Sequence, residues 1–301
     1  MSIIILMSTY NGAKYLREQI ESLLSQTIKV EILVRDDGST DSTQQILDDY
    51  AKRGILTWYK GENLGPGKSF FDLVQKAPVA DYYAFADQDD IWHKEKIQKA
   101  IEMLAVYSNT IPSLYCGDYI PVDSMLRPIQ IKKQAKAITP SLGSALVECI
   151  APGCTFVFNY KTLEMFRQYK NNFIYAHDWD LYRIFMAVGG NLIYDVNAYI
   201  LYRQHNNNVV GIQQCMIGKW LHRLNNYRNS LYRRRCSSTA KYIKHVYGQV
   251  IPKYNMAQLD ILIGIPEKWI CRFRFICSKN FRRSNIIDNS VFKLLALIGL
   301  L

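Results

Sequence analysis

Short, mainly apolar segments alternate with amphipathic segments through the first 90 residues of the chain. The apolar segments are residues 3–7, 30–34, 55–59 and 82–86. Runs of this length and composition indicate strands that are buried on both faces, as in parallel sheets. The segment after the first run carries Leu16, Ile20 and Leu23 at helical spacing. This alternation predicts an α/β fold with a mostly parallel sheet flanked by helices.

Three of the four predicted strands run directly into polar loops. These loops contain residues 8–11, residues 36–37 and residues 87–90. In open α/β sheets, ligands bind at the carboxyl ends of the strands. We therefore expect the three loops to converge on one ligand site.

The loop Asp87-Gln88-Asp89-Asp90 is the strongest local signal for chemistry. Three carboxylates within four residues repel one another unless a cation or strong donors neutralise them. Oxygen ligands of this kind suit Mg²⁺ or Mn²⁺ better than zinc. An ordinary acidic turn is the alternative, but a helix cap by Asp90 accounts for only one of the carboxylates. A phosphatase with an aspartyl nucleophile also uses a strand followed by D-x-D, although such a motif normally opens the chain.

The motifs taken together resemble the family-2 glycosyltransferases of the GT-A fold. The matching stretches are residues 4–12, 23–27, 35–41, 63–65 and 87–92. The last of them, Asp-Gln-Asp-Asp-Ile-Trp, is typical of the bacterial rhamnosyltransferase-like branch. The resemblance implies a GT-A sheet and an inverting, metal-dependent transfer of a sugar from a nucleotide sugar to a saccharide.

The resemblance also implies which residues bind the donor. The nucleotide-sugar-binding positions are Ser8, Tyr10, Asn11, Asp37, Asp87, Gln88 and Gly153. Ser8, Tyr10 and Asp37 match positions that hold the base, with Asp37 on its imide nitrogen. Asp87 and Gln88 match positions at the ribose, and Gly153 matches the glycine loop that faces the donor sugar.

Metal binding and proton abstraction are assigned in the same way. Asp89 and His205 match the ligands of a divalent metal, Mn²⁺ or Mg²⁺, which is the expected cofactor. Asp178 matches the position of the catalytic base. A carboxylate there can take the proton of the attacking hydroxyl. His177 replaces the usual glutamate before the base, a replacement that rhamnosyltransferase-like members share. Asp180 is a second candidate for the base.

The chain divides into two segments of different charge. We assign residues 1–211 to the glycosyltransferase domain, with a nucleotide-binding half at 1–105 and an acceptor-binding, catalytic half at 106–211. Residues 212–301 form a basic, aromatic and mainly helical C-terminal segment, with sixteen Lys and Arg against three acidic residues. Basic amphipathic helices with Trp and Phe suit an anionic membrane surface. Nucleic acid is the competing polyanion, and we do not expect it, because the chain contains no motif for binding it.

Composition excludes several other classes of protein. Apolar residues make up 49% and charged residues 21% of the chain, which excludes a disordered protein. Seven cysteines without a C-x-x-C pair indicate neither a disulfide framework nor a zinc site. The N-terminal residues do not form a signal peptide, and no apolar run approaches the roughly 20 residues that span a bilayer. We expect a cytoplasmic protein that is peripheral on the inner face of the cell membrane.

Two functional hypotheses of different classes follow. The first is a glycosyltransferase that uses dTDP-rhamnose or a UDP-hexose and acts on a lipid-linked or free saccharide in bacterial cell-surface polysaccharide synthesis. The second is a non-catalytic polyanion-binding protein built on a nucleotide-binding α/β body. Asp89→Ala distinguishes the two hypotheses, because loss of nucleotide-sugar turnover with intact folding supports the enzyme.

Overall fold

The chain folds into two compact units. The computed structural model describes residues 1–130, 140–170, 176–205 and 235–301. The first unit comprises Met1–Ile131, Ala151–Leu181 and Gly190–Arg203. The second unit comprises Lys132–Ile150, Tyr182–Gly189 and Gln204–Leu301. The boundary that we predicted at residue 211 lies outside the described residues.

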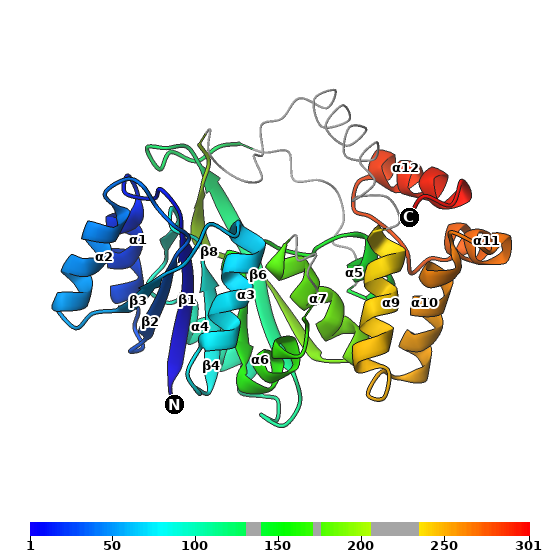
Figure 1. Cartoon of the computed structure of the whole chain (residues 1–301), viewed down its shortest axis with the longest axis horizontal. Helices are drawn as coiled ribbons and strands as arrows, with labels where there is room; N and C mark the ends of the chain where they lie inside the picture. Colours follow the sequence, from blue (N-terminus) through cyan, green and yellow to red (C-terminus); the bar gives the residue numbers. More distant parts are fainter. Residues whose placement is uncertain (131–139, 171–175, 206–234) are drawn as a thin grey trace. The chain divides into compact units, whose positions relative to one another are not determined.

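An eight-stranded sheet in the order β3-β2-β1-β4-β7-β6-β8-β5 forms the centre of the first unit (Figure 1). The strands are β1 (Ile3–Thr9), β2 (Glu31–Asp36), β3 (Thr57–Lys60), β4 (Tyr82–Ala86), β5 (Ile91–Trp92), β6 (Ser113–Val122), β7 (Val157–Asn159) and β8 (Asn191–Arg203). Strand β1 pairs in parallel with β2 and β4, and β2 pairs in parallel with β3. The parallel half of the sheet predicted from the sequence is therefore confirmed.

The other half of the sheet is mixed in direction. Strand β7 pairs antiparallel with β4 and β6, whereas β8 runs parallel to β6. The short strand β5 pairs antiparallel with the end of β8, where Ile91 is opposite Leu201. This last pairing brings the end of β8 beside the acidic loop that precedes β5.

Helices cover both faces of the sheet because successive residues of a buried strand point to opposite sides. Ile3, Ile5 and Met7 of β1 belong to a core shared with the first two helices and the fourth. Helix α3 packs on β1 and β2 and also contacts α6. Figure 1 shows α3 and α4 on opposite sides of the sheet. The helices of this unit are α1 (Leu16–Leu24), α2 (Thr43–Lys52), α3 (Pro66–Lys76), α4 (Lys96–Leu104) and α6 (Tyr160–Arg167), with a short 3₁₀ helix η1 (Gly153–Thr155).

The described part of the second unit is helical, as the sequence predicts for the C-terminal segment. Its helices are α5 (Leu142–Val147), α9 (Arg235–Tyr247), α10 (Lys253–Gly264), α11 (Trp269–Cys277) and α12 (Ile286–Leu297). Helix α10 packs on α9 and α11, and α11 packs on α12. Among the residues that the structure describes, no helix is long and apolar enough to cross a bilayer.

Candidate functional site

The acidic loop lies at the carboxyl end of β4, and its carboxylates crowd together. Carboxylate oxygens of Asp87 and Asp90 lie within 4.8 Å of each other and of the sulfur of Cys154, a buried residue of η1. Burial and the neighbouring carboxylates of Asp89 and Asp178 raise the pKa of Asp87 to about 7. Burial, together with the other two loop carboxylates, raises the pKa of Asp90 well above its ordinary value. Additional positive charge would stabilise this cluster.

The chemistry of this cluster fits a hard divalent cation. The Oδ2 atom of Asp90 is buried and has no hydrogen-bond partner among the described residues. Burial and the adjacent carboxylates raise the pKa of the Cys154 thiol, so this sulfur stays protonated and does not offer a thiolate. The available ligands are therefore carboxylate oxygens, which Mg²⁺ and Mn²⁺ prefer.

Arg203 holds the acidic loop from the last residue of β8. Its backbone N–H donates to Asp90 Oδ1 at 3.1 Å, and its Nε donates to the Asp89 carbonyl at 2.8 Å. Its two terminal nitrogens donate to the Ser124 carbonyl at 2.9 Å and to Glu18 Oε2 at 2.5 Å. The guanidinium is buried. One arginine thus joins β8, α1 and the loop after β6 to the acidic loop.

Arg203 is the main residue that the sequence analysis missed. A buried arginine has no local signature, and the only signal was its place at the end of an apolar strand, two residues before the predicted ligand His205. His205 is partly exposed and belongs to the second unit. Its role as a metal ligand stays a prediction, as does that of Asp89.

Gln88 joins the acidic loop to the turn after β1. Its Nε2 donates to the Tyr10 carbonyl at 3.1 Å, and the Tyr10 N–H donates to Gln88 Oε1 at 2.9 Å. A Cβ atom at Gly12 would lie 2.1 Å from Gln88 Oε1, so this contact requires glycine in the turn. The Tyr10 ring remains exposed and free to stack on a base. The Gln88 amide is thus already engaged, and its contact with a ribose stays a prediction.

Asp37 is buried and bound by three donors. The backbone N–H groups of Leu64 and Gly65 donate to its two oxygens, each at 2.9 Å, and Arg35 forms an ion pair with it. Arg35 is also buried and pairs with Asp72 at 3.0 Å. These contacts fix the loop after β2 against the loop before α3. Base recognition by Asp37 stays a prediction and would use the lone pairs that these donors leave.

Ser8 and Asn11 also stabilise the loops. The hydroxyl of Ser8 is hydrogen-bonded to that of Ser69 on α3 at 2.6 Å. Asn11 adopts a left-handed backbone conformation with φ of 47°, which asparagine tolerates better than most residues. Its side-chain oxygen accepts from the Thr40 N–H at 2.9 Å, and its own N–H donates to Ser39 Oγ at 2.9 Å. The loops after β1 and β2 therefore converge, as the topology predicts.

Asp178 lies at the start of α7 (His177–Val188) and faces the glycine turn. Its Oδ2 accepts from the Gly153 N–H at 2.9 Å, and its Oδ1 accepts from the Trp179 N–H at 2.7 Å. A Cβ atom at Gly153 would lie 2.7 Å from His177 Nε2, so this close approach also requires glycine. The Asp178 side chain is partly exposed, whereas Asp180 is buried. Of the two candidate bases, Asp178 is the one that is accessible to solvent.

His177 packs as an uncharged aromatic ring. It stacks on Phe70 with 3.8 Å between ring centroids and meets Phe85 edge-on at 4.8 Å. Burial lowers the pKa of His177 to about 4, so the imidazole is neutral near pH 7. A glutamate at this position would place a charge against two phenylalanine rings, which explains why histidine is suited to this chain.

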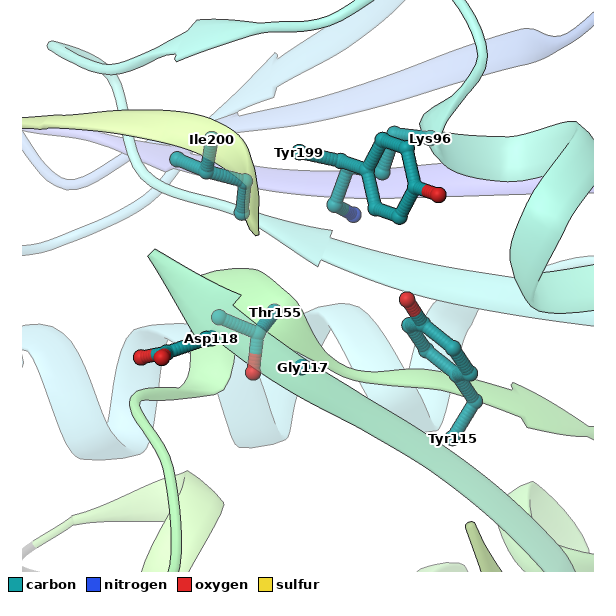
Figure 2. Close-up of a pocket in the computed structure, with 7 residues that line it drawn as sticks. All are labelled: Lys96, Tyr115, Gly117, Asp118, Thr155, Tyr199 and Ile200. Carbon is teal, nitrogen blue, oxygen red and sulfur yellow. The ribbon is translucent and has the colours of Figure 1, made fainter. Parts of the chain in front are cut away.

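Lys96 is the first residue of α4 and is a buried titratable group near the acidic loop. Its Nζ is 3.3 Å from the centroid of the Trp92 ring and has no hydrogen-bond partner among the described residues. Burial lowers the pKa of Lys96 to about 7. Figure 2 shows this side chain beside a small cavity lined by Lys96, Tyr115, Gly117, Asp118, Thr155, Tyr199 and Ile200. The cavity volume is about 10 Å³, roughly the space of one water molecule, so the cavity does not accommodate a nucleotide sugar.

Solved structures with a similar fold define the class of protein. The first 349 residues of TarS from Staphylococcus aureus, in complex with UDP, align with a TM-score of 0.58 and 18% identity over 88% of this chain and 70% of that one. The mannosyltransferase PcManGT from Pyrobaculum calidifontis, in complex with GDP-Man and Mn²⁺, aligns with a TM-score of 0.53 and 16% identity over 97% and 86%. The fold is that of the GT-A glycosyltransferases. Residues 4–201 match the family model of Glycosyl transferase family 2, and the chain belongs to this family and is a glycosyltransferase.

Curated relatives agree with this assignment. The chain is 32% identical to dTDP-rhamnosyl transferase RfbG of Shigella flexneri over 78% of this chain and 83% of that protein. It is 30% identical to an uncharacterized glycosyltransferase of Rickettsia typhi, of which it covers 64%. It is 32% identical to the putative teichuronic acid biosynthesis glycosyltransferase TuaG of Bacillus subtilis over 40% of this chain and 51% of that protein. The resemblance inferred from the motifs is thus confirmed.

Because Arg203 makes several buried hydrogen bonds, we expect even a charge-conserving substitution of this residue to lower the stability of the protein. Arg203→Lys keeps the charge but cannot form the forked set of hydrogen bonds. We expect the free energy of unfolding, measured by urea denaturation, to fall by about 3 kcal/mol. Arg17→Lys is the matched control, because Arg17 pairs with Asp49 at an exposed site. Equal stability of the two variants would show that the buried contacts of Arg203 do not position the loop.

The lowered pKa of Lys96 predicts how the stability of the protein depends on pH. Its pKa of about 7 in the folded protein lies below the unfolded value of about 10.4. The unfolded chain therefore binds the extra proton between these values, and the stability contributed by this group rises as the pH increases from about 7 to about 10.

Lys96→Met should remove that contribution and raise the free energy of unfolding at pH 7 by at least about 1 kcal/mol. The measurement is urea denaturation of both proteins across this pH range with EDTA present. Lys99→Met on the same helix is the control, because Lys99 is exposed and pairs with Glu102. Parallel pH profiles for wild type and Lys96→Met would contradict the lowered pKa.

Proposed function

We propose that this glycosyltransferase transfers a sugar from a nucleotide sugar to a saccharide acceptor with inversion of the anomeric carbon. The observation that carries the proposal is the position of η1 between Asp178 and the acidic loop: the Gly153 N–H donates to Asp178 at 2.9 Å, and the sulfur of the next residue, Cys154, lies within 4.8 Å of carboxylate oxygens of Asp87 and Asp90. A candidate base thus lies near a cluster of carboxylates that is suited to a divalent metal. This arrangement provides the groups that a single displacement at an anomeric carbon requires.

Asp178 takes the proton of the attacking acceptor hydroxyl. The hydroxyl oxygen forms a bond to the anomeric carbon while the bond from that carbon to the diphosphate oxygen breaks, and the electron pair leaves with the diphosphate. The Gly153 N–H and the Trp179 N–H hold the Asp178 carboxylate in one orientation. Because attack and departure occur on opposite faces, one displacement inverts the configuration.

Asp89, with its neighbours in the acidic loop, is the proposed holder of the divalent metal, together with His205. A bound Mn²⁺ or Mg²⁺ would neutralise the charge of the departing diphosphate. Arg203 keeps the loop backbone in place, through its hydrogen bonds to the Asp89 carbonyl and the Asp90 carboxylate. The complex of PcManGT with GDP-Man and Mn²⁺ supports a metal of this kind in the present chain.

The donor is proposed to be dTDP-rhamnose or a UDP-hexose. Similarity to a protein named as a dTDP-rhamnosyl transferase over most of both chains supports the first. The UDP complex of a structural neighbour supports a uracil nucleotide as the second possibility. The exposed Tyr10 ring is the surface on which either base would stack.

The acceptor is proposed to be a lipid-linked saccharide in the synthesis of a bacterial cell-surface polysaccharide, with the enzyme peripheral on the inner face of the membrane. The name of TuaG, a putative teichuronic acid glycosyltransferase, supports a polysaccharide product. The basic C-terminal segment supports placement at an anionic surface.

Substitution of the proposed base tests the reaction. We expect Asp178→Asn to lower kcat about 100-fold to 10,000-fold and to leave nucleotide binding nearly unchanged, because the carboxylate acts on the acceptor proton. Asp89→Asn should instead weaken metal-dependent nucleotide binding. The measurement is turnover of a panel of nucleotide sugars with Mn²⁺ or Mg²⁺, with binding followed by calorimetry and the product anomer identified by NMR.

Asp48→Asn, at an exposed position on α2, is the matched control and should retain wild-type turnover. Full turnover by Asp178→Asn together with loss of turnover by Asp180→Asn would move the base to Asp180. A product with retained configuration, or a wild-type enzyme that turns over no nucleotide sugar with either metal, would overturn the proposed function.

A further inference from the structure

Exposed apolar side chains concentrate on the last two helices of the chain. Eight of the large apolar residues that are exposed in the described part of the protein lie between residues 269 and 298, on α11 and α12 or directly after α12. Soluble proteins rarely expose apolar side chains in such density without a partner. These helices therefore present an interaction surface.

Helix α11 presents aromatic rings. Trp269 is 73% exposed and Phe273 is 58% exposed, and their spacing of four residues places them on one face of the helix. The opposite face is buried through Cys271 and Phe275, and Phe275 stacks on Phe281 with 4.6 Å between ring centroids. The helix is thus fixed to the unit on one side and carries large rings on the other.

Helix α12 carries an apolar stripe along its exposed side. Ile286, Ser290 and Leu294 follow one another at intervals of four residues, and Leu297 lies three residues further. All four are exposed, and serine is the only polar member. A surface helix normally places charged residues on its solvent face, so this pattern is inverted.

Arg272 joins the two helices that carry these apolar side chains. From α11 its guanidinium donates to the Leu297 carbonyl at the end of α12 at 3.3 Å, and to the Ile265 and Pro266 carbonyls at 2.9 Å each. Leu297 and Ile298 therefore lie beside the arginine that neighbours Phe273. We call Trp269, Phe273, Leu294, Leu297 and Ile298 the apolar face.

The surroundings of the apolar face are basic. Residues 268–301 contain seven Lys and Arg and one acidic residue, Asp288. That carboxylate lies 3.7 Å from Arg283, so its charge is already compensated. Lys268 and Arg274 are exposed beside Trp269 and Phe273. Large apolar side chains flanked by cations are the composition of an interfacial membrane helix.

We propose that the apolar face of α11 and α12 inserts into the interfacial region of an anionic lipid bilayer. A second copy of the chain is a poorer occupant, because the excess of positive charge around the two faces would repel. Nucleic acid would use the cations but not the aliphatic side chains. A bilayer with anionic headgroups uses both, through apolar burial and through about 1 kcal/mol for each nearby cation. Membrane insertion of the apolar face would bring the enzyme to a lipid-linked acceptor, and in this respect it rests on the proposed function.

The test compares full-length variants for binding to vesicles. Wild type should sediment with phosphatidylcholine vesicles that contain phosphatidylglycerol, and added salt should weaken binding. Trp269→Ser/Phe273→Ser should lower the partition coefficient about tenfold or more, because it removes two inserted rings. Val106→Ser, an exposed apolar position in the first unit, is the matched control and should bind as wild type does.

Tryptophan fluorescence tests whether Trp269 contacts the acyl chains, independently of the affinity for vesicles. Tryptophan emission of bound wild type should be quenched by vesicles with brominated acyl chains, and Trp269→Phe should remove that quenching while it retains binding. Unchanged vesicle binding by the double variant would overturn the proposal. A wild-type dimer that the double variant converts to a monomer would also overturn it, since the face would then be a contact between copies.

Failure of this proposal is distinguishable from failure of the proposed function. Turnover of a nucleotide sugar without vesicles should be the same in wild type and the double variant, because the apolar face contains no site residue. Vesicle binding without turnover would overturn the enzyme activity alone. Turnover without vesicle binding would overturn only the proposal that the apolar face inserts into a membrane.

Discussion

The crowding of several carboxylates at the end of a central strand, with Asp90 fully buried, is the constraint on which the rest of the site depends. Strand β4 is entirely buried and runs directly into the acidic loop, where Asp90 has no access to solvent. Burial of a charge is costly unless it is paired or hydrogen-bonded. Arg203 meets this need from the end of β8, so the loop takes its shape only once the last strand of the sheet is in place.

Most residues that the motifs mark for ligand binding also hold the loops together. Gln88 binds the Tyr10 backbone, and Asp37 accepts from the loop before α3 and from Arg35. These contacts fix the turns after β1, β2 and β4 against one another before any ligand arrives. A site built in this way keeps its remaining groups, above all the Tyr10 ring and the Asp178 carboxylate, in positions that need little rearrangement.

The first 211 residues and the C-terminal segment differ in net charge. The first 211 residues are nearly neutral, with 21 basic and 23 acidic residues, and the acidic residues include the clustered Asp87, Asp89 and Asp90. The basic excess lies in the C-terminal segment, next to the apolar face of α11 and α12. The acidic loop and the C-terminal segment belong to different units of the chain.

The sequence by itself determined the parallel half of the sheet and the convergence of three polar loops, because both follow from local periodicity and from the rule that parallel strands share an edge. It also determined the family, through motifs that are contiguous in the chain. Only the tertiary structure decided that Arg203 holds the acidic loop, that Cys154 lies beside Asp87 and Asp90, and that Asp178 rather than Asp180 is accessible to solvent. Burial and pairing across more than 50 residues leave no local pattern, and the apolar face of α11 and α12 became visible only when the opposite sides of those helices were covered.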